Sequence, residues 1–303
     1  MSAAPVRSVA ARGNFDGGHR GHQRLMDGAA ALASRLRAAP GVVTFEPHPR
    51  RFFRPQDPPF LIDAPARRDA LLRAAGAETI LTLAFDADLA RLSPAAFVCD
   101  VLRDRLRLAG VVAGADFRFG FERRGDAAAL KALCVEAGLD AELVEPLADA
   151  AAPGDKIGSS DVRAALAAGD MAGAAALLGR PWIVDGVVAE GQRLGRQLGF
   201  PTANLTLGDV VAPRHGVYAV LVDVGDVGEG LPGVANYGRR PTVGGDEPLL
   251  EVHVLDGAFD LYGRAIAVRF ERFLRPERKF DGLDALKAQI AADCDAARAV
   301  LTV

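Results

Sequence analysis

The chain has 303 residues, of which half are hydrophobic and a quarter are charged, so it can build two soluble globular domains. Its formal net charge of −3 gives no overall basic field that would favour nucleic acid or an anionic membrane surface. The three cysteines are widely spaced and no apolar run is signal-like or long enough to span a membrane, so we expect a cytoplasmic protein without a disulfide framework or cysteine metal cluster.

From the N-terminus to about residue 178, apolar runs of strand length alternate with stretches of helical period. This pattern predicts an α/β fold, a doubly wound parallel sheet with helices on both faces. We expect strands at 6–11, 42–45, 79–83, 110–113 and 141–144. We expect helices at 22–37, 65–75, 94–107 and 127–137. Such sheets bind ligands beyond the carboxyl ends of their strands, so the segments after the first two strands are expected to share one cleft.

The segment GNFDGGHRGH at 13–22 places His19 and His22 three residues apart, where a glycine-rich turn runs into a helix. Residues three apart share a helix face, and the first helical turn offers unpaired N–H groups and a positive dipole end. The arrangement therefore predicts a site for the phosphates of a nucleotide. Asn14 and Asp16 are either ligand-binding residues or plain turn formers, and His48 in TFEPHP either orients phosphate or decorates a rigid turn.

Two later segments of the first half also carry candidate binding residues. In GADFRFG, Asp116 stands beside Phe117 and Phe119, whose rings either stack a flat ligand or form ordinary core. Ser159 and Ser160 begin a predicted helix with Arg163 one turn later. They are either a simple cap or a clamp whose hydroxyls and planar guanidinium suit a departing pyrophosphate.

Near residues 179–184 the character of the sequence changes, because glycines become frequent and long helical periods give way to short β-rich runs. Runs at 217–224, 249–255 and 266–273 predict a small antiparallel barrel, and 283–301 predicts a closing helix. Alternation along the middle run should place Glu251 on one face of its strand. That carboxylate becomes a candidate general base only if it lies beside a triphosphate.

The second half also contains GQRLGRQLGFPTAN at 191–204. Its glycines either let backbone N–H groups approach phosphates or form a plain hairpin, and the oxygens of Thr202 and Asn204 are suitable magnesium ligands. The candidate ligand-binding residues of this loop are Gly191, Gly195, Gly199 and Pro201.

In their order along the chain, these motifs resemble those of the bacterial bifunctional riboflavin kinase/FAD synthetase family over nearly the whole length. They are GNFDGGHRGH, TFEPHP, GADFRFG, SSDVR, LLGRPW, GRQLGFPTANL, GVANYGRRPT, EVHVLD and DLYG. The resemblance implies an FMN adenylyltransferase domain at 1–180 and a riboflavin kinase barrel at 181–303. It implies riboflavin, FMN and ATP as substrates and magnesium as cofactor, with no nucleic acid, membrane or obligatory protein partner.

The resemblance also implies roles for matching residues. His19 and His22 would contact ATP phosphates, the SSDVR residues would steady pyrophosphate, and the segment 116–119 would bind flavin. Thr202 and Asn204 would serve Mg-ATP, while Glu251 would take the proton from the ribityl hydroxyl. Asn236 and Arg240, in GVANYGRRPT, complete the expected ligand-binding set.

Three residues depart from the family pattern, all of them in the first domain. Arg12 and Gly18 stand where the family usually has apolar residues, and Gly158 stands where it has a serine. An alternative interpretation is therefore a riboflavin kinase whose adenylyltransferase domain is weakened or lost. A catalytically silent flavin-binding protein is a further alternative, which the intact Thr202, Asn204, Glu251 and both histidines disfavour. A nucleotidyltransferase for another acceptor is the last alternative, which the barrel motifs disfavour.

Overall fold

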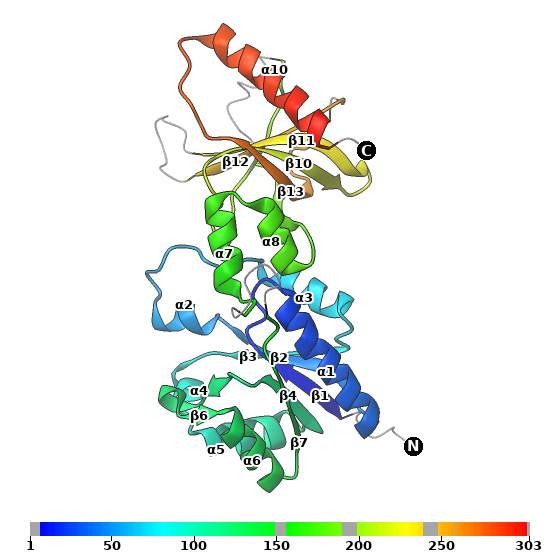
Figure 1. The fold of residues 1–303 in the computed structure, drawn as a ribbon, viewed down its shortest axis with the longest axis vertical. Helices are drawn as coiled ribbons and strands as arrows, with labels where there is room; N and C mark the ends of the chain where they lie inside the picture. The colour runs from blue at the N-terminus through cyan, green and yellow to red at the C-terminus, as the bar shows by residue number, and fades with distance from the viewer. Residues whose placement is uncertain (1–6, 149–155, 190–198, 239–247, 258, 302–303) are drawn as a thin grey trace. The chain divides into compact units, whose positions relative to one another are not determined.

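The computed structural model describes residues 7–148, 156–189, 199–238, 248–257 and 259–301. By packing, the chain divides into two compact units (Figure 1): residues 1–58 with 65–158, and residues 59–64 with 159–303. The packing division falls after Gly158, whereas the functional boundary near residue 180 stays a prediction. Three predicted site residues, Gly191, Gly195 and Arg240, lie outside the described residues.

The first unit contains the predicted parallel sheet, whose five strands run in the order β3-β2-β1-β4-β7. The strands are β1 (Ser8–Arg12), β2 (Ala39–Glu46), β3 (Thr79–Ala84), β4 (Gly110–Gly114) and β7 (Asp140–Val144), with a short hairpin of β5 (Arg118–Phe119) and β6 (Gly125–Asp126). The helices are α1 (Arg20–Leu36), α2 (Pro49–Phe53), α3 (Pro65–Ala74), α4 (Ala87–Arg91), α5 (Pro94–Ala96), η1 (Phe97–Arg105), η2 (Phe121–Arg123) and α6 (Ala127–Glu136). The four predicted helices are present, the third as α5 continued by η1.

Both faces of this sheet are covered, as the doubly wound prediction requires. On one face, Leu32 of α1 packs in a core with Val9 and Ala11 of β1. On the other face, Ala10 packs in a separate core with residues of η1 and α6. Alternate residues of β1 therefore enter opposite layers, because successive side chains of a strand point to opposite faces.

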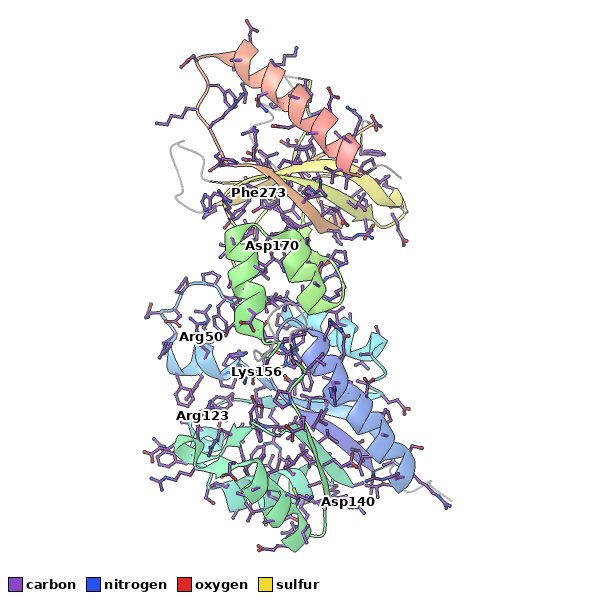
Figure 2. All side chains as sticks on the ribbon, viewed as in Figure 1. Arg50, Arg123, Asp140, Lys156, Asp170 and Phe273 are labelled. Atoms are coloured by element: carbon purple, nitrogen blue, oxygen red, sulfur yellow. The ribbon has the colours of Figure 1, made fainter. Side chains whose placement is uncertain are left out.

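The second unit contains the predicted antiparallel sheet, in the order β8-β13-β10-β11-β12-β9. Its elements are α7 (Ser159–Ala168), α8 (Met171–Leu178), β8 (Trp182–Val187), β9 (Ala203–Leu205), β10 (Gly216–Val224), β11 (Gly228–Gly238), β12 (Leu249–Val254), β13 (Ala265–Arg275) and α10 (Leu283–Val300). The Ala189 N–H donates to the Asn204 carbonyl over 2.9 Å, so the end of β8 bridges to β9 and the sheet curls into a barrel. Asp170 (Figure 2) caps α8 by accepting from the Gly173 N–H.

The barrel has two apolar cores, one on each face of its sheet. The interior core collects the largest buried side chains, among them Tyr218 and Phe270, together with residues of α7 and α8. The outer core joins Val217 of β10 to Cys294 and Ala297 of α10. The predicted closing helix therefore covers part of the outer face. Within the described residues, no helix is long and apolar enough to cross a membrane.

A short segment from the first half of the chain, residues 59–64, packs as part of the second unit. Ile62 is fully buried in the barrel core, and its carbonyl accepts a hydrogen bond from the Trp182 indole over 2.9 Å. The next residue, Asp63, is buried and pairs with the Arg180 guanidinium at 2.6 Å. This exchange could not be predicted from the sequence, because hydrophobic periodicity reports on local structure alone.

We expect Asp63→Ala to lower the free energy of unfolding of the second unit by about 3 kcal/mol, because the largely buried Arg180 guanidinium loses the Asp63 carboxylate that balances its charge. Urea unfolding can be followed by the fluorescence of Trp182, the single tryptophan of the chain. The control is Asp226→Ala, which removes an exposed pair with Arg264 and should cost below about 1 kcal/mol. Equal losses in the two variants would contradict the importance of the Asp63 pair.

Candidate active sites

The two histidines of the first motif lie together at the start of α1. His19 is the N-cap residue, and its Nδ1 accepts from the backbone N–H of His22 at 3.4 Å. The two imidazoles stack, with 3.7 Å between ring centroids. The preceding turn has positive φ at Gly17 (90°) and Gly18 (53°). Glycine at position 18 therefore suits the left-handed backbone that delivers both rings to the helix terminus.

Burial, and next the neighbouring His19, holds the pKa of His22 well below its usual value. His22 is therefore a neutral imidazole at neutral pH, in a place where a second positive charge is disfavoured. A bound anion would supply compensating negative charge, and the helix terminus adds its own positive potential. The site can accordingly bind phosphate by N–H donation.

The second predicted motif lies directly beside the first, at the carboxyl edge of the sheet. The Gly13 N–H donates to the Val43 carbonyl at 3.3 Å, and the Thr44 hydroxyl donates to the Asn14 carbonyl at 3.4 Å. The two segments are therefore adjacent, while the cleft that they are expected to share stays a prediction. His48 is the N-cap of α2, where its Nδ1 accepts from the Arg50 N–H at 3.0 Å. It serves the turn whether or not it also meets a ligand.

Asp16 of the first motif is buried, with 4% of its surface exposed. A buried carboxylate is costly unless it is paired or hydrogen-bonded. Asp16 therefore packs inside the protein, which a residue that only forms a turn need not do.

The phenylalanines of GADFRFG form a stacked pair. The rings of Phe117 and Phe119 are 5.4 Å apart and 8° from parallel. Phe119 is buried in the core beneath, whereas Phe117 is half-buried. Asp116 forms an ion pair with Lys156. Lys156 is labelled in Figure 2. Phe117 is consequently the more exposed of the two rings, and the stacking prediction for a flat ligand stays untested.

Ser159 and Ser160 open α7, and Arg163 lies one turn further along it. The Arg163 Nε donates to the carbonyl of Phe60 at 2.7 Å, a residue of the segment 59–64. These residues belong to the second unit by packing. Their predicted role toward a pyrophosphate stays a prediction.

In the barrel, β12 brings the candidate base between two amides. Glu251 lies directly opposite Asn204 of β9 on one side and Asn236 of β11 on the other. Directly opposite side chains in antiparallel strands share a face, with Cβ atoms about 5 Å apart. Asn204 is buried, while Glu251 and Asn236 are half-buried. The pairing therefore collects a carboxylate and two amides on one surface.

The predicted alternation along β12 is confirmed. Leu250, Val252 and Val254 are buried in the barrel interior, whereas Glu251 and His253 are half-buried on the other face. Asn236 also lies opposite Val217, which belongs to the core under α10. The row of Asn204, Glu251 and Asn236 therefore lies on the outer face of the barrel, which is the face that α10 partly covers.

Sequence reasoning missed the part played by His253. Its Nδ1 is 2.7 Å from the carbonyl of Pro201, and since a carbonyl can only accept, Nδ1 carries the proton. The same ring meets Phe200 edge to face at 5.6 Å. His253 thus fastens the start of the PTAN segment, with Thr202 and Asn204, to the strand that carries Glu251. The sequence signal that could have identified His253 was its position two residues after Glu251, on the same face of β12.

Fold and sites together are those of a two-unit enzyme that acts on nucleotides. A family model described as FAD synthetase matches residues 2–161, and one described as riboflavin kinase matches residues 178–301.

Curated relatives are similar over almost the entire chain. A bifunctional riboflavin kinase/FMN adenylyltransferase of Pseudomonas fluorescens is 45% identical, covering 96% of this chain and 92% of the relative. The protein of that name in Escherichia coli K12 is 41% identical, covering 97% and 93%. A solved structure described as a macrolide-efflux protein from Streptococcus pneumoniae matches with a TM-score of 0.86 and 32% identity, covering 98% of this chain and 95% of that one. The chain belongs to the bifunctional riboflavin kinase/FMN adenylyltransferase family.

The low pKa of His22 makes a prediction about pH. As pH falls through about 6.5, the unfolded chain gains a proton at this position that the folded chain does not bind. Its contribution to the free energy of unfolding is therefore complete above that pH and decreases below it. In NMR titration, the imidazole signals of His22, assigned by their loss in His22→Gln, should not shift near pH 6.5. A midpoint at the ordinary histidine value would contradict the burial argument.

Proposed function

We propose that this enzyme phosphorylates riboflavin to FMN in the barrel and then transfers AMP from ATP to FMN in the first unit, releasing pyrophosphate. The cross-strand row of Asn204, Glu251 and Asn236 is the observation that carries the proposal. It supplies a base and neighbouring oxygen donors on one surface. The two family models and the curated relatives agree in naming both activities.

In the kinase reaction the nucleophile is the ribityl 5′ hydroxyl, a poor nucleophile until its proton is removed. Glu251 accepts that proton as the hydroxyl oxygen attacks the γ-phosphorus of ATP, and ADP leaves. The half-buried carboxylate keeps access to a substrate, and strand pairing places it between Asn204 and Asn236. Positioning of the two reactants contributes the rest of the acceleration.

The donor set of the PTAN segment fits a magnesium ion. Thr202 and Asn204 offer hard oxygens, and Asn204 is buried in register with the base. When bound, magnesium neutralises charge on the ATP phosphates. Thr202 and Asn204 would hold it, while the Pro201 carbonyl keeps the segment against His253.

In the adenylyltransferase reaction the nucleophile is the phosphate of FMN, which is already anionic and requires no base. The FMN oxygen attacks the α-phosphorus of ATP and pyrophosphate leaves. His19 and His22 donate N–H groups to the ATP phosphates at the α1 terminus, where the helix dipole favours negative charge.

Glu251→Gln should reduce the kcat of FMN formation by about 10²–10⁴-fold, because the amide cannot accept the proton. Conversion of supplied FMN to FAD should continue, since that reaction uses the first unit. Riboflavin, FMN and FAD can be separated over time after incubation with ATP and magnesium. Glu229→Gln, at an exposed position of β11, is the matched control and should retain both activities. FMN formation at the wild-type rate in Glu251→Gln would remove the base assignment.

His253→Ala should raise the KM for ATP in FMN formation by about fivefold, corresponding to loss of one hydrogen bond that fixes the PTAN segment. His253→Asn should recover much of the loss, because its amide N–H can replace Nδ1–H as donor. The matched control is His215→Ala, whose imidazole lies near Glu277 instead. An unchanged KM for ATP in His253→Ala would show that Pro201 needs no such anchor.

The wild-type enzyme also tests the alternative of a weakened adenylyltransferase. The proposal expects supplied FMN and ATP to give FAD and pyrophosphate in equal amounts. The departure at Gly18 does not impair the turn, since glycine suits the positive φ there. FMN that accumulates from riboflavin without any FAD would establish the alternative instead.

A further inference from the structure

Arg12, one of the departures from the family pattern, ends β1 immediately before the phosphate-binding turn. Its guanidinium carbon lies 4.0 Å from the ring centroid of Phe117, 4.8 Å from that of Phe45 and 5.5 Å from that of Phe97. Three aromatic rings therefore surround one cation at the carboxyl end of the central strand. This is the edge at which parallel sheets bind their ligands.

The cation has no acidic partner among the residues that the structure describes, and its shielded Nε donates no hydrogen bond there. Burial, and next the charge of Arg123 (Figure 2), lowers the pKa of Arg12 to about 9. An unpaired and partly desolvated charge is costly, and cation–π contacts offset only part of the cost. Such a group at a ligand-binding edge indicates a function.

The surroundings of Arg12 indicate which chemical class of ligand would pair with its guanidinium. The Arg12 guanidinium lies over the Phe117 ring and Phe119 stacks parallel to the same ring, so Phe117 holds the guanidinium in place and offers no free face. The planar guanidinium presents its N–H donors in a fixed fork, which matches acceptors that lie in one plane. A matching ligand is flat and carries carbonyl oxygens along one edge. The pyrimidine end of a flavin has this form.

We propose that Arg12, held over the Phe117 ring, binds the carbonyl edge of the flavin ring of FMN in the first unit. The inference rests on the proposed adenylyltransferase function. Arg12 adjoins Gly13 of the histidine turn, so one short stretch of chain serves both the ring of FMN and the phosphates of ATP. Arg12 is thus a specificity residue that this chain has in place of an apolar one.

The test is Arg12→Ile, which restores apolar character, together with Arg12→Lys. With supplied FMN, the KM for FMN in FAD formation should rise roughly tenfold in Arg12→Ile, since a charge-assisted hydrogen bond is lost. The KM for ATP should change less than about twofold, because the histidine turn is untouched. The KM for FMN of Arg12→Lys should lie between those of wild type and Arg12→Ile, because lysine keeps the charge but lacks the planar fork.

Two further measurements separate ring recognition from a structural role. FMN analogues with a thiocarbonyl at ring position 2 or 4 are weaker acceptors, so wild type should discriminate against at least one of them and Arg12→Ile should discriminate less. Thermal unfolding should show Arg12→Ile to be no less stable than wild type, because an unpaired cation is removed. Arg35→Ile, which replaces an exposed arginine paired with Glu142, is the matched control and should alter neither KM.

An unchanged KM for FMN in Arg12→Ile, or an equal rise in both KM values, would overturn the assignment. Should Arg12→Ile unfold, the intermediate KM expected of Arg12→Lys and its weaker analogue discrimination still decide the question. Failure of the wild-type enzyme to make FAD would instead refute the adenylyltransferase function itself. The two failures are therefore distinguishable.

Discussion

The pairing of β12 with β9 and β11 is the interaction on which the chemistry of the second unit depends. Because directly opposite residues of paired strands share a face, this register places Glu251 between Asn204 and Asn236. A shift by one residue would bury Glu251 in the barrel and bring Val252 to the surface. The apolar residues of β12 prevent that shift, since they fill the interior core. The alternation of apolar and polar residues along β12 thus determines both the packing of the barrel and the position of Glu251.

The first unit solves a different problem, that of bringing two anions together. A turn with positive φ at two glycines delivers His19 and His22 to a helix terminus, where burial keeps His22 neutral in the absence of a ligand. A neutral His22 imidazole still donates an N–H group, and it avoids the repulsion that two adjacent cations would cause. The fixed positive charge at this edge is supplied by Arg12, which its aromatic neighbours hold in place. The histidine turn therefore supplies hydrogen-bond donors, while Arg12 at the end of the preceding strand supplies the positive charge.

Much of this could be predicted, because the decisive patterns are local. The five parallel strands, the long helices and the alternation of β12 follow from period and burial, and the structure confirms them. The adjacency of the histidine turn and TFEPHP could be predicted because both follow parallel strands, whose carboxyl ends lie at the same edge of the sheet. The anchor between His253 and Pro201 did not follow, because a hydrogen bond across 52 residues has no local signature. The position of Arg12 in the sequence was visible as a departure, but its aromatic surroundings were not.

The sequence by itself determined the two kinds of sheet, the order of the motifs and the residue types able to handle phosphate, since each depends on neighbours along the chain. Only the tertiary structure decided which distant side chains meet. It assigned Ile62 and Asp63 to the barrel unit, where they pair with Trp182 and Arg180 more than a hundred residues later. Packing is governed by the shape and polarity of surfaces in space, and a linear pattern of hydrophobicity carries no record of that distance.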